Sequence, residues 1–234
     1  MSVLEGWQLS RRTRRRATWQ VTACGSLAAL LLLLLSTISL TTGDYPIPVS
    51  DVLRTLLGLP SPADLIVREL RLPRVLTAML VGAAFGLSGA MFQAVIRNPL
   101  ASPDLIGVTA GASAGAVAAI TIGGLSAVLV PSFALLEGGI AAVLVYLLAH
   151  RGGLELHRLV VVGIALGGTG FAAGALSSLT SFLLVKAEIT NAQQATVWLT
   201  GSLHGRTYDH AMVPLVALAL ALPLVPGVPP YSVR

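Results

Sequence analysis

Charged side chains are scarce in this sequence: they make up 11% of its 234 residues, whereas soluble domains carry about 25%. Cysteine is scarcer still, and the single Cys24 excludes an internal disulfide framework and a cysteine-rich metal site. Histidine, aspartate and glutamate do not cluster at the spacing of metal ligands, so neither a metal site nor another cofactor is predicted. The Gly-Lys-Ser/Thr signature of a phosphate-binding loop is also missing, so no nucleotide-binding site is predicted.

Hydrophobic residues, by contrast, make up 55% of the sequence and gather in long runs. A helix of about 20 apolar residues crosses the hydrocarbon core of a bilayer, and several runs reach that length. The sequence pI near 10.1 suggests nucleic acid as a partner, but the basic residues flank the hydrophobic runs, as they do in membrane proteins. The sequence therefore predicts an all-α, polytopic bundle of transmembrane helices, with membrane lipid around it and no nucleic-acid partner.

Six spans are predicted. We expect a basic cytoplasmic N-terminus at 1–20, a transmembrane domain at 21–225 and a short cytoplasmic tail at 226–234. Within the domain, Pro131 and Glu137 are expected to mark an outer turn, and Ser50 is expected to cap a short helix. A second short helix is expected at 192–199. The spans themselves are predicted at about 21–40, 74–96, 105–129, 133–149, 159–184 and 211–225.

Basic residues predict which side of the membrane each loop occupies. Five arginines lie between Arg11 and Arg16, directly before the first hydrophobic run, and hold the N-terminus in the cytoplasm. A twin-arginine export signal is the competing interpretation, but no small-residue cleavage site follows Leu40 and further spans do follow. Arg151 and Arg158 belong to a basic loop that is placed inside by the same rule. We therefore expect a multi-pass protein of the cytoplasmic membrane.

Small residues recur at helical spacing in three of the predicted spans. Such stripes allow two helix backbones to approach closely, which is how helices associate in lipid. We predict helix packing at Gly82, Gly86 and Gly89 in the second span, at Gly107, Gly111 and Gly115 in the third, and at Gly163 and Gly167 in the fifth.

Four arginines fall on the predicted outer side, between positions 54 and 74. Arginine outside opposes the orientation signal, so this cluster needs another explanation. It is either a docking surface for an acidic partner, or a set of side chains that reach lipid phosphate and pair with Asp64 and Glu69. Charge alone leaves both interpretations open. The members of this outer arginine cluster are Arg54, Arg68, Arg71 and Arg74.

The stretch from Arg71 to Asp104 resembles the membrane subunits of ATP-driven importers for ferric siderophores, haem and cobalamin, the FecCD-type permeases of type II importers. Two later stretches agree, 158–167 and 198–203, and the second is similar to permeases of the ferric-enterobactin type. The resemblance covers about 20 to 225. Its residues are Arg71-Leu72-Pro73-Arg74, Gly82-Ala83, Gly86-Leu87-Ser88-Gly89, Gln93, Asn98-Pro99-Leu100-Ala101, Pro103 and Gly107.

This resemblance implies a permease of ten spans that pairs with a second permease subunit, identical or different, around a central pathway. Two cytoplasmic ATPase subunits drive such transporters, and an extracytoplasmic substrate-binding protein delivers the cargo. Arginines at the places of Arg71 and Arg74 receive glutamates of that binding protein, so both guanidiniums are expected to face outward. The resemblance places a cytoplasmic gate at Leu156 and His157. Family members are longer than this chain, which resembles their N-terminal portion.

Other classes of function are less consistent with the sequence. An intramembrane enzyme needs paired ionisable groups inside a span, and Asp104 and Glu137 are predicted near span ends. A secondary transporter normally shows intramembrane charge or interrupted half-helices. We therefore favour the permease of a ferric-siderophore importer, a transport subunit without enzymatic activity of its own. Haem or cobalamin as cargo, and an inactive truncated permease, remain open alternatives.

Overall fold

The computed structural model describes residues 3–97, 102, 104, 108–125, 129–149 and 171–227. All regular elements within these residues are helical, which confirms the predicted all-α class. The chain divides into two compact units, which are described separately. The first unit is Met1–Met79 with Gly205–Ala211, and the second is Leu80–His204 with Met212–Arg234.

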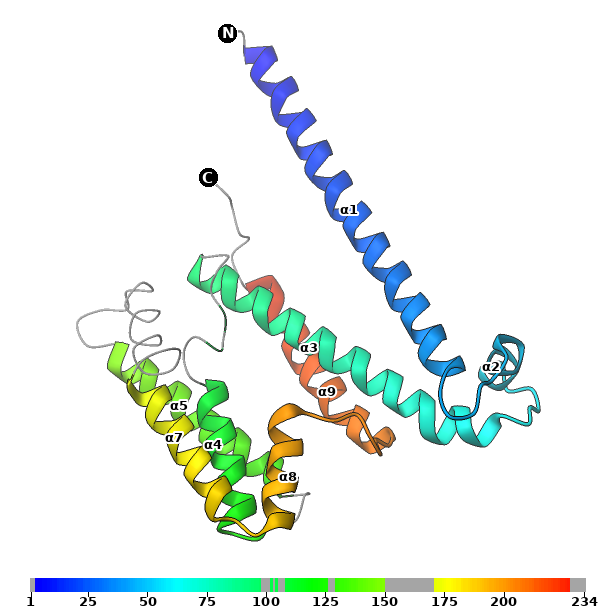
Figure 1. Cartoon of the computed structure of the whole chain (residues 1–234). Coiled ribbons are helices and arrows are strands. Elements are labelled where there is room, and N and C mark those ends of the chain that lie inside the picture. Colours follow the sequence, from blue (N-terminus) through cyan, green and yellow to red (C-terminus); the bar gives the residue numbers. More distant parts are fainter. Residues whose placement is uncertain are drawn as a thin grey trace. The chain divides into compact units, whose positions relative to one another are not determined.

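The first unit is built around the end of a long helix, α1 (Val3–Thr41). The short helix α2 (Val49–Leu56) follows beside that end, and the π-helix η1 (Ile66–Arg71) leads directly into α3 (Leu72–Ile96) (Figure 1). Apolar side chains from all four elements and their connections exclude water from one small core. Its buried members are Leu40, Ile47, Val52, Ala63, Val67 and Val75.

The helix α2 begins differently from the prediction. Pro48, not Ser50, occupies the N-cap position, and its carbonyl accepts the N–H groups of Asp51 (3.0 Å) and Val52 (3.2 Å). The expectation for Ser50 was wrong because the helix starts at Val49, two residues earlier than a serine cap at that position requires. Proline suits this place, since the first N–H groups of a helix have no partner within it and none is lost.

The π-helix η1 has a local cause in the sequence. Pro73 stands near the start of α3, where it has no N–H to donate and its ring opposes the carbonyl four residues back. A wider turn precedes it, in which the Leu72 N–H donates to the carbonyl of Val67, five residues back. The helix therefore passes the proline without ending. The continuous helical segment runs over Ile66–Ile96, and the predicted second span, 74–96, lies within it.

Three helical segments are long and apolar enough to cross a membrane: Trp19–Thr41 with 23 residues, Ile66–Ile96 with 31 and Tyr208–Gly227 with 20. They coincide with the predicted first, second and sixth spans. The predicted third, fourth and fifth spans contain shorter apolar helices. Part of the fifth, with the inner loop before it, lies outside the described residues.

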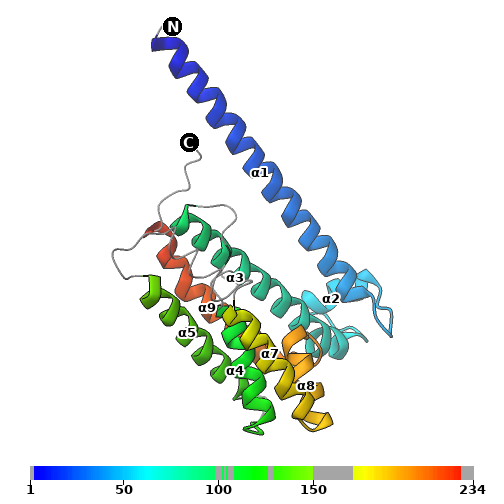
Figure 2. The same ribbon diagram turned by 60° about the vertical axis from the view of Figure 1, so that its left-hand side comes forward.

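The second unit contains α4 (Val108–Thr121), α5 (Val130–Ala149), α7 (Phe171–Lys186) and α8 (Ile189–Thr200). Figure 2 shows α5 and α7 beside α4, and α8 also contacts α4. The predicted short helix at 192–199 is confirmed as α8. Trp198 packs against the core of this unit, whose buried members are Ala116, Val117, Ile120, Val130, Ala134 and Ala195. The last helix, α9 (Tyr208–Ala221), continues into a 3-10 turn, Leu222–Gly227.

Two glycines of the predicted third span lie directly against α5. A Cβ atom on Gly111 would stand 2.8 Å from the Cβ of Ala141, and one on Gly115 would stand 2.3 Å from the Cγ of Glu137. Any side chain at either position would therefore force the helices apart. Glu137 lies inside α5 with its stem over Gly115, so the expected outer turn at Pro131 and Glu137 was wrong. Proline is tolerated in the first turn of a helix, and Pro131 is the second residue of α5.

The remaining predicted packing glycines have a different environment. A Cβ on Gly82, Gly86 or Gly89 would meet nothing within 4 Å among the described residues. Within the part of the chain that the structure describes, the glycine stripe of α3 therefore has no close neighbour. Gly107, Gly163 and Gly167 lie outside that part.

Replacement of Gly111 by leucine is expected to lower the thermal unfolding midpoint of the protein in detergent. The new side chain would enter the space of Ala141, and overpacking of this kind costs about 1–3 kcal/mol. Gly139→Leu on α5 is the matched control, because a Cβ there meets nothing within 4 Å. Equal midpoints for the two variants would contradict close packing of α4 on α5.

Candidate functional site

The outer arginine cluster lies entirely within the first unit. Arg54 is on α2, Arg68 and Arg71 are on η1, and Arg74 is in the first turn of α3. Arg54, Arg68 and Arg74 are exposed, whereas Arg71 is half-buried. The four arginines thus do not share one environment, and their hydrogen bonds separate them further.

Arg71 is bonded to the end of α1. Its Nη1 donates to the carbonyl of Leu40 at 2.8 Å, and its Nη2 donates to the carbonyl of Tyr45 at 2.5 Å. Leu40 is the penultimate residue of α1, and the last carbonyls of a helix have no partner within it. A cation at this place is also attracted to the partial negative charge of the helix end, which stabilises the helix. Arg71 therefore caps α1 and ties the following loop to the start of α3.

Gly43 provides the space that this guanidinium occupies. Its φ is +156°, and a Cβ on it would stand 2.8 Å from the Nη2 of Arg71 and 3.3 Å from its Cζ. Residues with a side chain rarely adopt this backbone conformation. The contact and the backbone angle both favour glycine at this position. The loop between α1 and α2 is thus shaped around Arg71.

Arg68 does the same for α2. Its Nη2 donates to the carbonyl of Thr55 at 2.9 Å, in the last turn of that helix. The phenolic hydroxyl of Tyr208 donates to the carbonyl of Arg68 at 2.7 Å, which joins the first residue of α9 to η1. Two arginines of η1 therefore complete the C-terminal ends of two different helices.

Asp64 completes this hydrogen-bonded network. Its carboxylate accepts the buried hydroxyl of Thr55 at 2.6 Å and the N–H of Ser61 at 3.4 Å. The hydrogen bond from Thr55 lowers the pKa of Asp64 below its ordinary value of 3.8; desolvation opposes this, and the Ser61 N–H and the charge of Arg68 reinforce it. These contacts favour the ionised form of Asp64.

Arg71 and Arg74, both expected to face outward, differ in their surroundings. Both terminal nitrogens of Arg71 donate to backbone carbonyls, while the side chain of Arg74 is exposed. The sequence does not reveal this difference, because neither acceptor is a side chain. The only hint in the sequence is Gly43, because a glycine leaves room for a neighbouring side chain. The side chain that fills this room is that of Arg71, and the sequence does not show that the two residues are in contact because they are far apart in the chain.

A second feature, which the sequence analysis missed, is a hollow of about 350 Å³ between α4, α7 and α8. Hydroxyl groups dominate its polar lining, from Thr109 and Ser113 on α4 and from Ser177, Thr180 and Ser181 on α7. Leucines 176, 184 and 199 supply the apolar walls. Among the residues that the structure describes, no charged side chain lines the hollow, and its hydroxyl groups can hydrogen-bond water or a neutral polar group. The signal in the sequence is the run of hydroxyls within an otherwise apolar helix.

Two predicted site residues, the gate candidates Leu156 and His157, lie outside the described residues. Among the residues that are described, no group of three or more His, Cys, Asp or Glu side chains is arranged to hold a metal ion.

A family comparison identifies the chain. The model of the FecCD transport family matches residues 31–227. The chain belongs to the FecCD transport family. The matched range contains α2, η1, α3 and the whole outer arginine cluster, together with the helices of the second unit. The predicted resemblance is confirmed.

Individual FecCD relatives agree with this assignment. The chain is 43% identical to the achromobactin transport system permease protein of Dickeya dadantii over 78% of its own length and 52% of the relative. It is 37% identical to the ferric enterobactin transport system permease protein of Escherichia coli over 77% and 54% of the two lengths. A solved structure described as an inward-facing metal-chelate type ABC transporter matches with a TM-score of 0.64 and 29% identity, over 84% of this chain and 58% of that one. The chain thus spans about half the length of the curated FecCD relatives it matches.

Thr55→Val is expected to raise the pKa of Asp64 toward its ordinary value of 3.8, because the strongest donor to the carboxylate is removed. Since the folded chain lowers this pKa, the stability that Asp64 contributes is complete above 3.8 and is lost as the pH falls through the lower folded value. A ¹³C NMR titration of labelled aspartate in detergent measures the change.

The control for this titration is Thr42→Val, whose hydroxyl donates to the carbonyl of Ile38 and not to Asp64. An unchanged Asp64 titration in Thr55→Val would show that the hydroxyl does not stabilise the carboxylate.

Proposed function

We propose that this chain is a permease subunit of an ATP-driven importer that moves ferric siderophore across the cytoplasmic membrane. The observation that carries the proposal is the family match over residues 31–227. The printed names of the relatives, achromobactin and ferric enterobactin transport systems, favour an iron–siderophore complex as the cargo. The helices of membrane-spanning length are consistent with a transport pathway.

The proposed importer has further subunits. The chain would pair with a second permease subunit, engage cytoplasmic ATPase subunits below it, and receive cargo from an extracytoplasmic binding protein. The division of labour fits a sequence that has no nucleotide-binding loop.

Uptake of ⁵⁵Fe-labelled siderophore into membrane vesicles tests this function. The vesicles contain the chain with the ATPase and binding protein of the same cells. Uptake is expected to require ATP and to survive a protonophore. Uptake that depends on the proton gradient instead would indicate a secondary transporter. Uptake of labelled haem or cobalamin, and not of the labelled iron complex, would identify that compound as the cargo. No uptake above that of vesicles without the chain would contradict the proposal.

The proposed docking surface for the binding protein is centred on Arg74. An exposed guanidinium can grip a carboxylate through two parallel hydrogen bonds, which lysine cannot match. We expect Arg74→Glu to weaken docking by roughly tenfold, most strongly at low salt, where exposed charges are least screened.

Surface-plasmon measurements with the permease in nanodiscs provide the docking affinity. Arg54→Glu, farther from the span, is expected to cost less. A binding protein with a docking glutamate changed to arginine is expected to restore part of the affinity of Arg74→Glu. Unchanged docking of Arg74→Glu at normal expression would assign this arginine to lipid anchoring.

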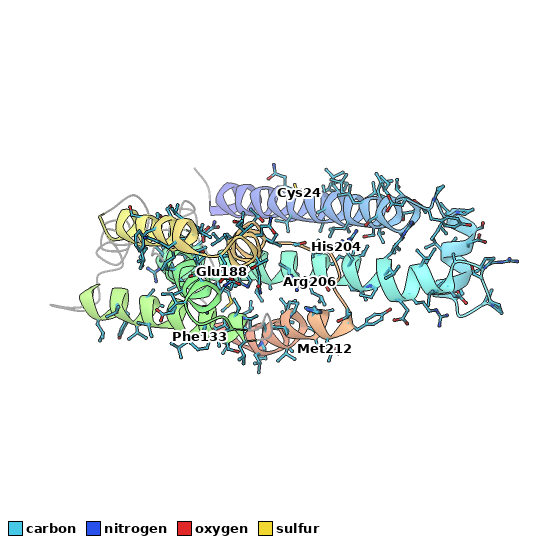
Figure 3. All side chains as sticks on the ribbon, turned by 60° about the horizontal axis from the view of Figure 1, so that its bottom comes forward. Cys24, Phe133, Glu188, His204, Arg206 and Met212 are labelled. Carbon is cyan, nitrogen blue, oxygen red and sulfur yellow. The ribbon has the colours of Figure 1, made fainter. Side chains whose placement is uncertain are left out.

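The proposed topology places the N-terminus inside and the loop after α1 outside. Cys24 is exposed on α1 (Figure 3), so labelling requires a background in which it is replaced by alanine. In intact cells, Tyr45→Cys is expected to react with an impermeant maleimide, and Gly153→Cys is expected not to react. The reverse pattern of labelling would overturn this orientation.

A further inference from the structure

We infer that Tyr208 is a positioning residue of the proposed docking surface: its hydroxyl holds the segment Gly205–Ala211 against the π-helix η1, so that the partner meets both together. The inference rests on the proposed function. Its basis is the hydrogen bond from the phenolic hydroxyl of Tyr208 to the carbonyl of Arg68, which is 2.7 Å long and joins residues 140 positions apart in the chain. Both residues belong to the first compact unit.

The carbonyl of Arg68 is open to this donor because of a proline. In η1 a backbone hydrogen bond reaches five residues back, from the N–H of Leu72 to the carbonyl of Val67. By the same spacing, the carbonyl of Arg68 would accept from residue 73, but Pro73 has no N–H. A backbone carbonyl left open in this way is normally satisfied by water or by a side chain. Here the hydroxyl of Tyr208 satisfies it.

The segment that carries Tyr208 is ordered at the start of α9. The N–H of Thr207 donates to Nδ1 of His210 at 3.3 Å, and the N–H of His210 donates to the carbonyl of Thr207 at 3.1 Å. This exchange caps the first turn of α9, whose first residue is Tyr208. Ala211 lies three residues after Tyr208, on the same face of the helix, and is only 6% exposed. The helix therefore presents Tyr208 to η1 in a defined position.

The hydrogen bond places a second chain segment beside the outer arginine cluster. Arg68 is a member of that cluster and lies on η1, and the segment bonded to it carries the exposed Asp209. A partner that docks on the cluster thus meets the start of α9 in an arrangement that is fixed before docking. Fixing a surface beforehand raises affinity, because less conformational freedom is lost on binding. The partner is the proposed binding protein, since this segment is continuous with its docking surface.

Three variants separate the roles of the hydroxyl. Tyr208→Phe removes the hydroxyl and keeps the ring. Tyr45→Phe is the matched control, because Tyr45 lies in the same unit and its hydrogen bond among the described residues uses the backbone carbonyl and not the hydroxyl. The third variant adds Pro73→Ala to Tyr208→Phe. It returns an N–H to position 73, so the carbonyl of Arg68 regains a donor within the helix while α9 stays unbonded.

Carbonyl NMR in nanodiscs reports the hydrogen bond directly. Arg68 and Glu69 form the only Arg–Glu pair in the sequence, so ¹³C-carbonyl arginine combined with ¹⁵N-glutamate isolates the Arg68 carbonyl. A carbonyl carbon resonates downfield when its oxygen accepts a hydrogen bond. Tyr208→Phe is expected to move this resonance upfield, and addition of Pro73→Ala is expected to move it back. Tyr45→Phe is expected to leave it in place.

Hydrogen exchange reports whether α9 is held. The amides of 205–211 are expected to exchange on the order of fivefold faster in Tyr208→Phe, which corresponds to the loss of one ordinary hydrogen bond. They are expected to stay fast when Pro73→Ala is added, because the new N–H satisfies the carbonyl of Arg68 but does not hold α9.

Docking of the purified, siderophore-loaded binding protein of the same cells tests the surface. Its affinity is expected to fall on the order of fivefold in Tyr208→Phe, with the salt dependence of the wild type because no charge changes, and to be unchanged in Tyr45→Phe. In a chain with Cys24→Ala, Asp209→Cys is expected to react more slowly with a maleimide while the binding protein is docked. Addition of Tyr208→Phe is expected to weaken this protection.

Three results would overturn the inference. An Arg68 carbonyl resonance and an exchange rate at 205–211 that are both unchanged in Tyr208→Phe would show that the hydroxyl does not hold α9. Exchange at 205–211 that returns to the wild-type rate when Pro73→Ala is added would show that the hydroxyl serves η1 alone. Full affinity in Tyr208→Phe despite faster exchange would show that the segment is not part of the docking surface.

Failure of the proposed function gives a different result. A wild-type protein that binds no such partner would refute the docking function, and the positioning role with it. The NMR and exchange measurements use the permease alone, so they test the hydrogen bond between α9 and η1 in either case.

Discussion

The carbonyl groups at the end of a helix have no partner within that helix, and the first unit is organised around satisfying them. At the end of α1 the acceptor is the carbonyl of Leu40, and at the end of α2 it is the carbonyl of Thr55. Both receive guanidinium donors from the single short π-helix η1. Hydrogen bonds and a small apolar core therefore both connect these three elements.

The second unit meets a different constraint, the close approach of backbones. Gly111 and Gly115 let α5 lie against α4, and the stem of Glu137 fills the space that a side chain at Gly115 would take. Lipid is as apolar as a helix surface, so packing of this kind must hold membrane helices together. The same helix α4 contributes Thr109 and Ser113 to the hydroxyl-lined hollow. Small residues of α4 thus form the contact with α5 and also line part of the hollow.

Much of this arrangement could be predicted from the sequence. Long apolar runs predict the helical class and the first, second and sixth spans, because burial in lipid depends on composition alone. The start of α2 and the extension of α3 could not, since each depends on local backbone geometry around a proline. The division between Arg71 and Arg74 was missed for another reason. Charge patterns identify cations, but backbone carbonyls that accept from them are invisible in the sequence.

Pro73 is the residue that connects these observations. In a regular α-helix, residues three positions apart share a face, so Arg71 and Arg74 would point the same way. Proline forces a wider turn immediately before it, and that turn ends at Arg71. The extra residue per turn shifts Arg71 relative to the helix that follows. Arg71 then reaches back to the end of α1 while Arg74 remains exposed on α3. One proline between two arginines thus accompanies two different side-chain environments, half-buried for Arg71 and exposed for Arg74.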